Sequence, residues 1–362
     1  MVHRLGIPLE EIDTPALLID LDVMEGNIAR MADFFNGVEA NLRPHVKTHK
    51  TPILAHKQIA AGAIGVTCAK LGEAEVMAEG GIRDILVANQ IVGAQKVERL
   101  VNLTRHADVI VAVDNAENVK ELSMAAQRQG AMVRVLVEVD VGLNRCGVDP
   151  GEPALDLAKR VAESKGLKFA GVMGYEGHAV FVADVQERTR EARLAMEILT
   201  DTTSLIKRAG LSVEVVSAGG TGTYNITGTY PGVTEIQAGS YILMDGSYRK
   251  IVPFDCALTV LTTVVSAQSP ERIIVDAGMK SISQDMGMPE VKDQSDLVVT
   301  RLSEEHGKLK STSGASPLKP GDKIELIPSH ACTTINLHDR YYAVRNGSLE
   351  AVWLIGGRGK SQ

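Results

Sequence analysis

The 362-residue chain is poor in aromatic side chains, which make up 4% of it, and it has no long apolar run. No segment reaches the roughly 20 consecutive apolar residues that a membrane-spanning helix needs. The first 15 residues lack the apolar stretch that a signal peptide requires. We therefore expect a cytoplasmic protein.

Two further patterns are missing from the chain. The four cysteines (Cys68, Cys146, Cys256 and Cys332) are scattered and form no CxxC pair, which argues against a disulfide framework. The net charge is −7 and the basic residues form no stripe, which argues against a nucleic-acid partner.

The sequence does contain a regular alternation of strand-like and helix-like segments. A β-rich run at 14–21 precedes Asp22 and Glu25, whose spacing is typical of a helix start. Eight strand candidates follow, with helical stretches between most of them: 41–46, 64–68, 85–88, 109–113, 133–139, 169–173, 213–217 and 234–237. Eight strands with crossover helices indicate a (β/α)8 TIM barrel. An open doubly wound sheet is the alternative, but no GxGxxG follows the first strand.

Beyond the eighth strand the pattern changes to β-rich segments with little helical periodicity. The RNGS sequence at 345–348 predicts a hairpin, and the polar stretch 303–320 predicts an exposed loop. We therefore predict a barrel over residues 22–245. A second, C-terminal β domain covers 246–362, and the N-terminal strand within 1–21 joins it.

The first cluster of reactive side chains is RPHVKTHK, at the end of the first barrel strand. Active sites of such barrels lie at the C-terminal ends of the strands. Strand alternation would place Arg43, His45 and Lys47 on one face. A lysine among cationic neighbours can have a lowered pKa, as a Schiff-base nucleophile requires. The same residues also fit a basic surface loop.

Two glycine-containing segments each follow a predicted strand. SAGGTGTY at 217–224 would let backbone N–H groups approach an anion such as a phosphate, and EIQAGSYILMD at 235–245 would add further amides. A flexible glycine-rich loop without a ligand is the alternative interpretation.

The segment PSHACTTINLHD, at 328–339, places His330 two residues before Cys332 on a predicted strand or turn. Imidazole and thiolate together suit zinc. Two protein ligands leave positions open for water or substrate, which is typical of a catalytic metal. An ordinary buried cysteine beside a hydrogen-bonded histidine is the alternative.

Taken in order, these segments resemble the D-threonine aldolase and D-serine dehydratase family of fold-type III, alanine-racemase-like enzymes. The resemblance spans nearly the whole chain and rests on DTPALLIDLD, RPHVKTHK, EVDVGLNRCGV, GGTGTY, IQAGSYILMD, VDAGMKS and PSHACTTINLHD. It implies a barrel with a C-terminal β domain, pyridoxal 5'-phosphate (PLP), a divalent metal and a homodimer.

The resemblance also implies particular roles for residues. Lys47 would hold PLP as a Schiff base, and Arg145 would approach the phenolic oxygen of the cofactor. Further cofactor contacts would be Tyr175, Ser217, Gly219, Gly220, Thr221, Gln237, Gly239 and Ser240. His330 and Cys332 would bind the metal beside the substrate hydroxyl. The thiolate favours zinc, with manganese and magnesium as alternatives.

The motifs divide between two reactions. The aldolases carry His-x-Asp where this chain has His330 and Cys332, which is the dehydratase arrangement, whereas the tail looks more like that of the aldolases. Phe181 stands where the aldolases have an acid/base histidine, and His178 or His306 would substitute for it. We predict a lyase that cleaves β-hydroxy-D-amino acids to glycine and an aldehyde. Dehydration and deamination of such a substrate is the alternative, followed by a racemase and a non-catalytic PLP-binding protein.

Overall fold

The computed structural model describes residues 4–315 and 318–362. The chain divides into two compact units. One combines Met1–Ala29 with Ser240–Gly359, and the other combines Arg30–Gly239 with Lys360–Gln362. The first division falls within a helix, α1 (Leu21–Asn36), whereas the sequence pattern suggested a boundary at its start.

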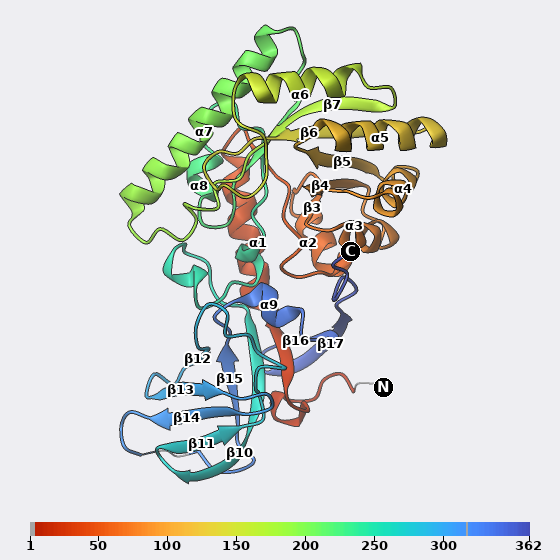
Figure 1. Ribbon diagram of the computed structural model, residues 1–362. Helices are drawn as coiled ribbons and strands as arrows, with labels where there is room; N and C mark the ends of the chain where they lie inside the picture. Colours follow the sequence, from red (N-terminus) through yellow and green to blue (C-terminus); the bar gives the residue numbers. More distant parts are fainter. Residues whose placement is uncertain (1–3, 316–317) are drawn as a thin grey trace. The chain divides into compact units, whose positions relative to one another are not determined.

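The second unit is built on a parallel eight-stranded sheet (Figure 1). Its strands are β2 (Asn41–Leu42), β3 (Val66–Cys68), β4 (Asp84–Gln90), β5 (Asp108–Val113), β6 (Val133–Glu138), β7 (Leu167–Met173), β8 (Val215–Ala218) and β9 (Glu235–Ile236). They are ordered β2-β9-β8-β7-β6-β5-β4-β3. A parallel bridge between His45 and Thr67 joins the two ends of this order. The predicted (β/α)8 barrel is thereby confirmed.

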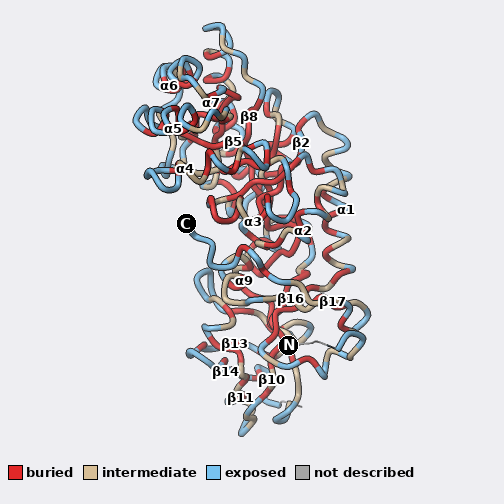
Figure 2. The backbone as a smooth tube through the Cα atoms, turned by 90° about the vertical axis from the view of Figure 1, so that its right-hand side faces the viewer, coloured by how far each residue is buried: buried red, intermediate tan, exposed pale blue. Residues whose placement is uncertain are grey.

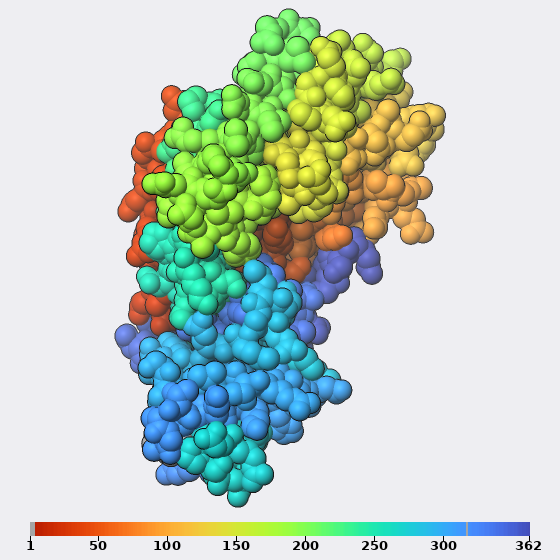
Figure 3. Space-filling view, turned by 60° about the vertical axis from the view of Figure 1, so that its left-hand side comes forward, coloured from red at the N-terminus to blue at the C-terminus, as the bar shows by residue number. Residues whose placement is uncertain are grey.

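Helices connect these strands on the outside of the unit: α2 (Pro52–Ala60), α3 (Leu71–Glu79), α4 (Ala94–Leu103), α5 (Ala116–Gln129), α6 (Glu152–Glu163), α7 (Val185–Arg208) and α8 (Tyr224–Thr227). Local chemistry sets their ends. Asn115 accepts a hydrogen bond from the Asn118 amide at the start of α5, and Asp184 does the same for α7. The outer surfaces of α6 and α7 lie side by side (Figure 3).

The barrel strands are apolar almost throughout, because side chains on both faces of a barrel strand are buried. Figure 2 shows the strands in the colour of buried residues and the helices with exposed outer positions. One core cluster collects side chains from five strands: Leu86, Ile110, Ala112, Leu136, Ala170, Met173 and Val215. The strand ends are therefore held rigidly, which suits a functional site built on them.

The first unit is a mainly antiparallel nine-stranded sheet ordered β11-β14-β13-β12-β15-β10-β1-β16-β17. The strands are β1 (Ala16–Asp20), β10 (Leu258–Ser269), β11 (Arg272–Val275), β12 (Glu290–Val291), β13 (Leu297–Leu302), β14 (Gly307–Ser311), β15 (Lys323–Ile327), β16 (Arg340–Arg345) and β17 (Ser348–Leu354). Strand β1 pairs with β10 and β16, so the N-terminal strand belongs to this sheet as expected. The sheet also carries one short α-helix, α9 (Ala331–Ile335), and the 3₁₀ turns η1 (Leu9–Glu11), η2 (Ser240–Ile242) and η3 (Tyr248–Lys250).

The hairpin predicted from RNGS is confirmed. It joins β16 to β17, and Asn346 and Gly347 have φ values of 50° and 70°, which is the conformation of a type I′ turn. Three other expectations need correction. Asp20 rather than Asp22 caps α1, because its Oδ1 accepts the Val23 N–H. The stretch 303–320 contains strand β14 instead of being loop throughout, since its alternating apolar residues pair with β11 and β13.

The third correction concerns His330 and Cys332. They lie at the start of α9 rather than on a strand, with His330 as the N-cap residue. In the described part of the chain, no helix combines the length and apolar character that crossing a membrane would demand. The cytoplasmic location stays a prediction.

Candidate active site

The segment that carries Lys47 leaves the barrel strand in a turn. After the bridge at His45, residues 46–49 turn, and the Lys47 N–H donates to Nδ1 of His45 at 3.4 Å. The strand alternation that grouped Arg43, His45 and Lys47 therefore ends before the lysine. Arg43 is buried and forms ion pairs with Glu235 and Asp84, at 2.9 and 2.5 Å, so it has a structural role.

Two lysines occur in this segment, and their surroundings differ. Lys50 forms an ion pair with Glu73, a buried carboxylate that also accepts the Ala69 and Lys70 N–H groups at the start of α3. Lys47 is exposed. Because Lys50 is committed to Glu73, Lys47 is the lysine of this segment that suits covalent attachment of a cofactor.

Lys47 and Arg145 are both electrostatic neighbours of His45. Burial, and then the charges of Lys47 and Lys50, hold the pKa of His45 well below its usual value, and Arg145 acts in the same direction. The exposed Arg145 guanidinium lies 5.7 Å from the centre of the Tyr175 ring, within the range of a cation–π contact. The ends of β2, β6 and β7 thus bring these four side chains to one region.

The loops after β8 and β9 pack closely against this region. A Cβ atom added to Gly220 would lie 3.1 Å from the Tyr175 ring, and one added to Gly239 would lie 2.4 Å from the His45 carbonyl oxygen. Glycine is required at position 239, where a Cβ would overlap the backbone of His45, whereas at position 220 a Cβ would be in tight contact with the Tyr175 ring. Thr221 and Ser217 are buried beside these glycines in sequence, and Gln237 donates to the Ser217 hydroxyl at 2.8 Å. Ser240 opens η2 and belongs to the other unit.

Sequence reasoning missed a buried carboxylate, Glu176, that holds the same loop. It accepts the Gly219 N–H at 3.1 Å and the hydroxyls of Thr223 and Thr227 at 2.6 and 2.5 Å. The amide of Gly219 therefore points to Glu176, although the resemblance implied a contact with the phosphate. The only signal in the sequence was an acidic residue between Tyr175 and Gly177.

The histidines considered as acid/base groups lie in different units. His178 is exposed on the loop after β7 and packs against Gly142 in the loop after β6, where a Cβ would be 3.1 Å from its Cε1. Phe181, three residues after His178 in the sequence, is 40% exposed. His306 is exposed in the turn between β13 and β14 of the β domain. Only His178 shares the barrel unit with Lys47 and Arg145.

In the β domain, His330 is held by an acidic partner. Its Nδ1 lies 2.7 Å from Oδ2 of Asp285, whose other oxygen accepts the hydroxyls of Ser283 and Thr333. Burial lowers the pKa of His330, but the hydrogen bond and charge of Cys332, followed by those of Asp285, outweigh it and raise this pKa to about 9. The imidazole and the thiol are thus close neighbours, as two ligands of one cation need to be.

The start of α9 is fixed by a second buried carboxylate. Asp245 accepts the Ala331 N–H at 2.9 Å, and also the N–H groups of Ser247 and Tyr248. Burial raises the pKa of Asp245 above its usual value. The hydrogen bond from the Ala331 N–H anchors the backbone between His330 and Cys332, the two residues that flank Ala331.

The donor set suits a dication with open coordination positions. A neutral imidazole and a thiolate are ligands that zinc prefers, and a carboxylate on the other ring nitrogen is the usual outer partner. Residues 4–315 and 318–362 contain no group of three or more His, Cys, Asp or Glu side chains arranged to hold a metal. His330 and Cys332 are two neighbouring side chains of the kinds that zinc prefers.

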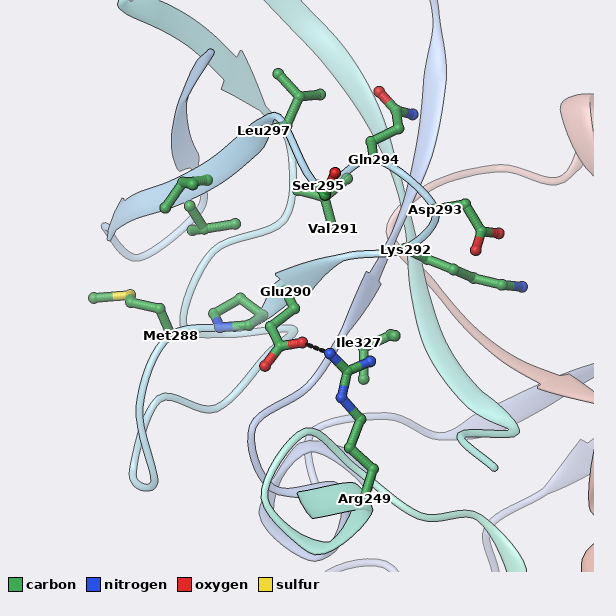
Figure 4. A pocket seen from close by; sticks show the side chains of 13 residues that line it. Arg249, Met288, Glu290, Val291, Lys292, Asp293, Gln294, Ser295, Leu297 and Ile327 are labelled. Atoms are coloured by element: carbon green, nitrogen blue, oxygen red, sulfur yellow. Dashed lines mark hydrogen bonds and ion pairs between the residues drawn. The ribbon is translucent and has the colours of Figure 1, made fainter. Parts of the chain in front are cut away.

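A separate cleft of about 670 Å³ lies in the β domain beside β12 and β13 (Figure 4). Arg249 projects into it and is paired with Glu290, with Lys250 as a second cation on the same carboxylate. None of the residues expected to contact PLP or the metal lines this cleft. The Arg249 guanidinium is thus neutralised by a carboxylate of the same cleft.

The fold and these residues define an alanine-racemase-like enzyme with an added β domain. The alanine racemase N-terminal domain model matches residues 19–246, and the putative serine dehydratase domain model matches residues 257–344. A D-threonine aldolase of Arthrobacter sp is 38% identical over 99% of this chain and 96% of its own length. The chain belongs to this family of PLP-dependent lyases, as its sequence motifs indicated.

Solved structures agree. The crystal structure of a D-threonine aldolase from Filomicrobium marinum has a TM-score of 0.95 and 40% identity, covering 99% of this chain and 100% of that one. A D-threo-3-hydroxyaspartate dehydratase in which a cysteine is replaced by alanine, described as metal-free, has a TM-score of 0.88 and 29% identity, with coverage of 96% and 98%. The family implies PLP. A metal and a homodimer are not established by these comparisons.

Proposed function

We propose that this protein is a PLP- and divalent-metal-dependent lyase that cleaves β-hydroxy-D-amino acids into glycine and an aldehyde. The observation that carries the proposal is the similarity to a D-threonine aldolase along 99% of the chain, at 38% identity. The dehydratase structure is less similar, at 29% identity. Threonine-like, serine-like and hydroxyaspartate-like side chains all fit the proposed substrate class.

The residues at the barrel strand ends fit the cofactor. Lys47 supplies the amine for covalent attachment, and the space kept open by Gly220 and Gly239 suits a phosphate beside the Ser217 and Thr221 hydroxyls. Once bound, PLP takes up the electron pair of the bond that breaks at Cα. Arg145 supplies a cation for an anionic oxygen of the cofactor, in keeping with its position over Tyr175.

His330 and Cys332 would hold the metal, with zinc as the first choice because one ligand is a thiolate. A bound dication lowers the pKa of the β-hydroxyl of the substrate and stabilises negative charge on its oxygen. Asp285 orients the His330 ring through Nδ1, which directs Nε2 toward a ligand. His178 would take the hydroxyl proton in place of the histidine that Phe181 replaces.

Dehydration is the second candidate, and a specific observation favours it. The metal-free dehydratase structure carries a cysteine-to-alanine replacement, and in this chain Cys332 lies beside His330. In that reaction Lys47 would remove the Cα proton and the β-hydroxyl would leave. A racemase needs neither His330 nor Cys332, so the arrangement of this pair disfavours it.

Product analysis separates the two reactions. The purified protein would be incubated with D-threonine, PLP and zinc or manganese. Glycine with acetaldehyde supports the aldolase, whereas ammonia with 2-oxobutanoate supports the dehydratase. Accumulation of L-allothreonine, the product of inversion at Cα alone, without either pair of products would contradict both and support a racemase.

A further inference from the structure

The carboxylate of Glu176 is fully buried, with 0% of the residue exposed, in the loop that follows β7. A buried carboxylate is costly unless hydrogen-bond donors surround it. Here each oxygen is occupied. Oε2 accepts the Gly219 N–H at 3.1 Å, and Oε1 accepts the hydroxyls of Thr223 and Thr227 at 2.6 and 2.5 Å.

Two of these contacts lie on the loop between β8 and α8 and the third, Thr227, is the last residue of α8, 43 to 51 residues further along the chain. The Thr223 hydroxyl also accepts the Gly220 N–H at 3.3 Å, so the carboxylate fixes two consecutive amides of the loop, one directly and one through a hydroxyl. Helix α8 has four residues, too few to be stable without such contacts.

The neighbouring residue acts on the same loop from another direction. Tyr175 packs its ring tightly against Gly220, since a Cβ added to this glycine would lie 3.1 Å from the ring. Adjacent residues of the β7 loop therefore determine both the conformation of the glycine loop and the space above Gly220. Glu176 does not itself bind a phosphate, because its carboxylate is negatively charged and only accepts hydrogen bonds.

We infer that Glu176 is a positioning residue of the phosphate site: its carboxylate holds residues 217–223 in the conformation that receives the phosphate of the cofactor. The inference rests on the proposed assignment of this loop to the phosphate. It also means that Gly219 contributes its shape, with φ at 78°, while its N–H serves Glu176. The amides that meet the phosphate then belong to other residues of the two glycine segments.

The test compares two cofactor analogues on the cofactor-free protein. PLP and pyridoxal share the ring and the aldehyde but differ in the phosphate, so the ratio of their dissociation constants isolates the phosphate site. The constants would be measured by titration of the visible absorption band in the wild type, Glu176→Gln and Thr227→Val. Glu235→Gln is the matched control, because Glu235 is also a buried barrel carboxylate and pairs with Arg43.

We expect Glu176→Gln to weaken PLP binding about tenfold or more and to leave pyridoxal binding unchanged, as the loss of hydrogen bonds to a charged acceptor implies. Thr227→Val removes one hydroxyl and keeps the side-chain shape, so it should change the ratio of the two dissociation constants in the same direction but by less. Glu235→Gln should leave the ratio unchanged. Thr227→Val provides the decision if Glu176→Gln does not fold.

An equal loss of PLP and pyridoxal affinity in Glu176→Gln would overturn the inference, because a general loss of structure affects both ligands alike. An unchanged ratio in both loop variants would overturn it as well. A wild-type protein that binds pyridoxal as tightly as PLP would instead refute the assignment of the loop to the phosphate, on which the inference depends.

Discussion

Asp285 offers the sharpest test of the proposed metal site. Its Oδ2 lies 2.7 Å from Nδ1 of His330, and its Oδ1 accepts the hydroxyls of Ser283 and Thr333. Replacement of Asp285 by Asn keeps the size of the side chain but converts one oxygen into an N–H₂ group. If that group faces His330, the ring must accept at Nδ1 and carry its proton on Nε2, which removes Nε2 as a ligand.

The expected loss follows from this geometry. Outer-shell partners of metal-binding histidines typically change metal affinity by about 10- to 100-fold, and we expect Asp285→Asn to weaken zinc binding within that range. Zinc affinity would be measured by competition with a chromophoric chelator at neutral pH. The visible band of PLP serves as an internal check, since Lys47 lies in the other unit.

Ser283→Ala is the matched control. It removes one hydrogen bond from Asp285 and leaves the contact with His330 intact, so it should weaken zinc binding much less. Equal zinc affinity in the wild type and Asp285→Asn would refute the reasoning, because the orientation of His330 would then not depend on its acidic partner.

Four other outcomes are expected. Lys47→Ala should lose the visible band that added PLP gives the wild type; retention of the band would rule out covalent attachment at this lysine. Chelator treatment should abolish turnover with PLP still bound, and Cys332→Asp should shift the metal preference from zinc toward manganese or magnesium, as comparison of activities with each metal would reveal. The buried His49 has its pKa lowered to about 4 by burial, so its unfolded form binds a proton first on acidification. It should cost about 3 kcal/mol of folding stability between pH 6.5 and 4, and His49→Gln should show a smaller loss in urea unfolding at the two pH values.

The barrel could be predicted from the sequence because its strands are continuous apolar runs separated by helical periodicity. The run at 109–113, for example, corresponds to β5 (Asp108–Val113). The helix start at Asp20 was harder to predict, because Asp20 and Asp22 are both plausible caps. The backbone contact with Val23 decides between them.

The site could be predicted only where its residues form a local motif. Lys47, the glycine loop and the His330–Cys332 pair each stand in a short recognisable segment. Glu176 and Asp285 do not, since Glu176 meets its partners 43 to 51 residues away and Asp285 meets His330 45 residues away. Such contacts depend on the tertiary fold, which one sequence does not specify residue by residue.

Glu176 and Asp245 are two buried carboxylates that accept backbone N–H groups, and sequence reasoning assigned a role to neither. They solve the same physical problem in different units. Each lies beside a helix of four or five residues, α8 or α9, too short to be stable alone. Each accepts a backbone N–H next to that helix, from Gly219 or Ala331. Because a charged acceptor bonds more strongly than a neutral one, a short loop can be held in one conformation without a long helix behind it. The residues proposed to meet the phosphate and the metal are therefore fixed by buried anions that would touch neither.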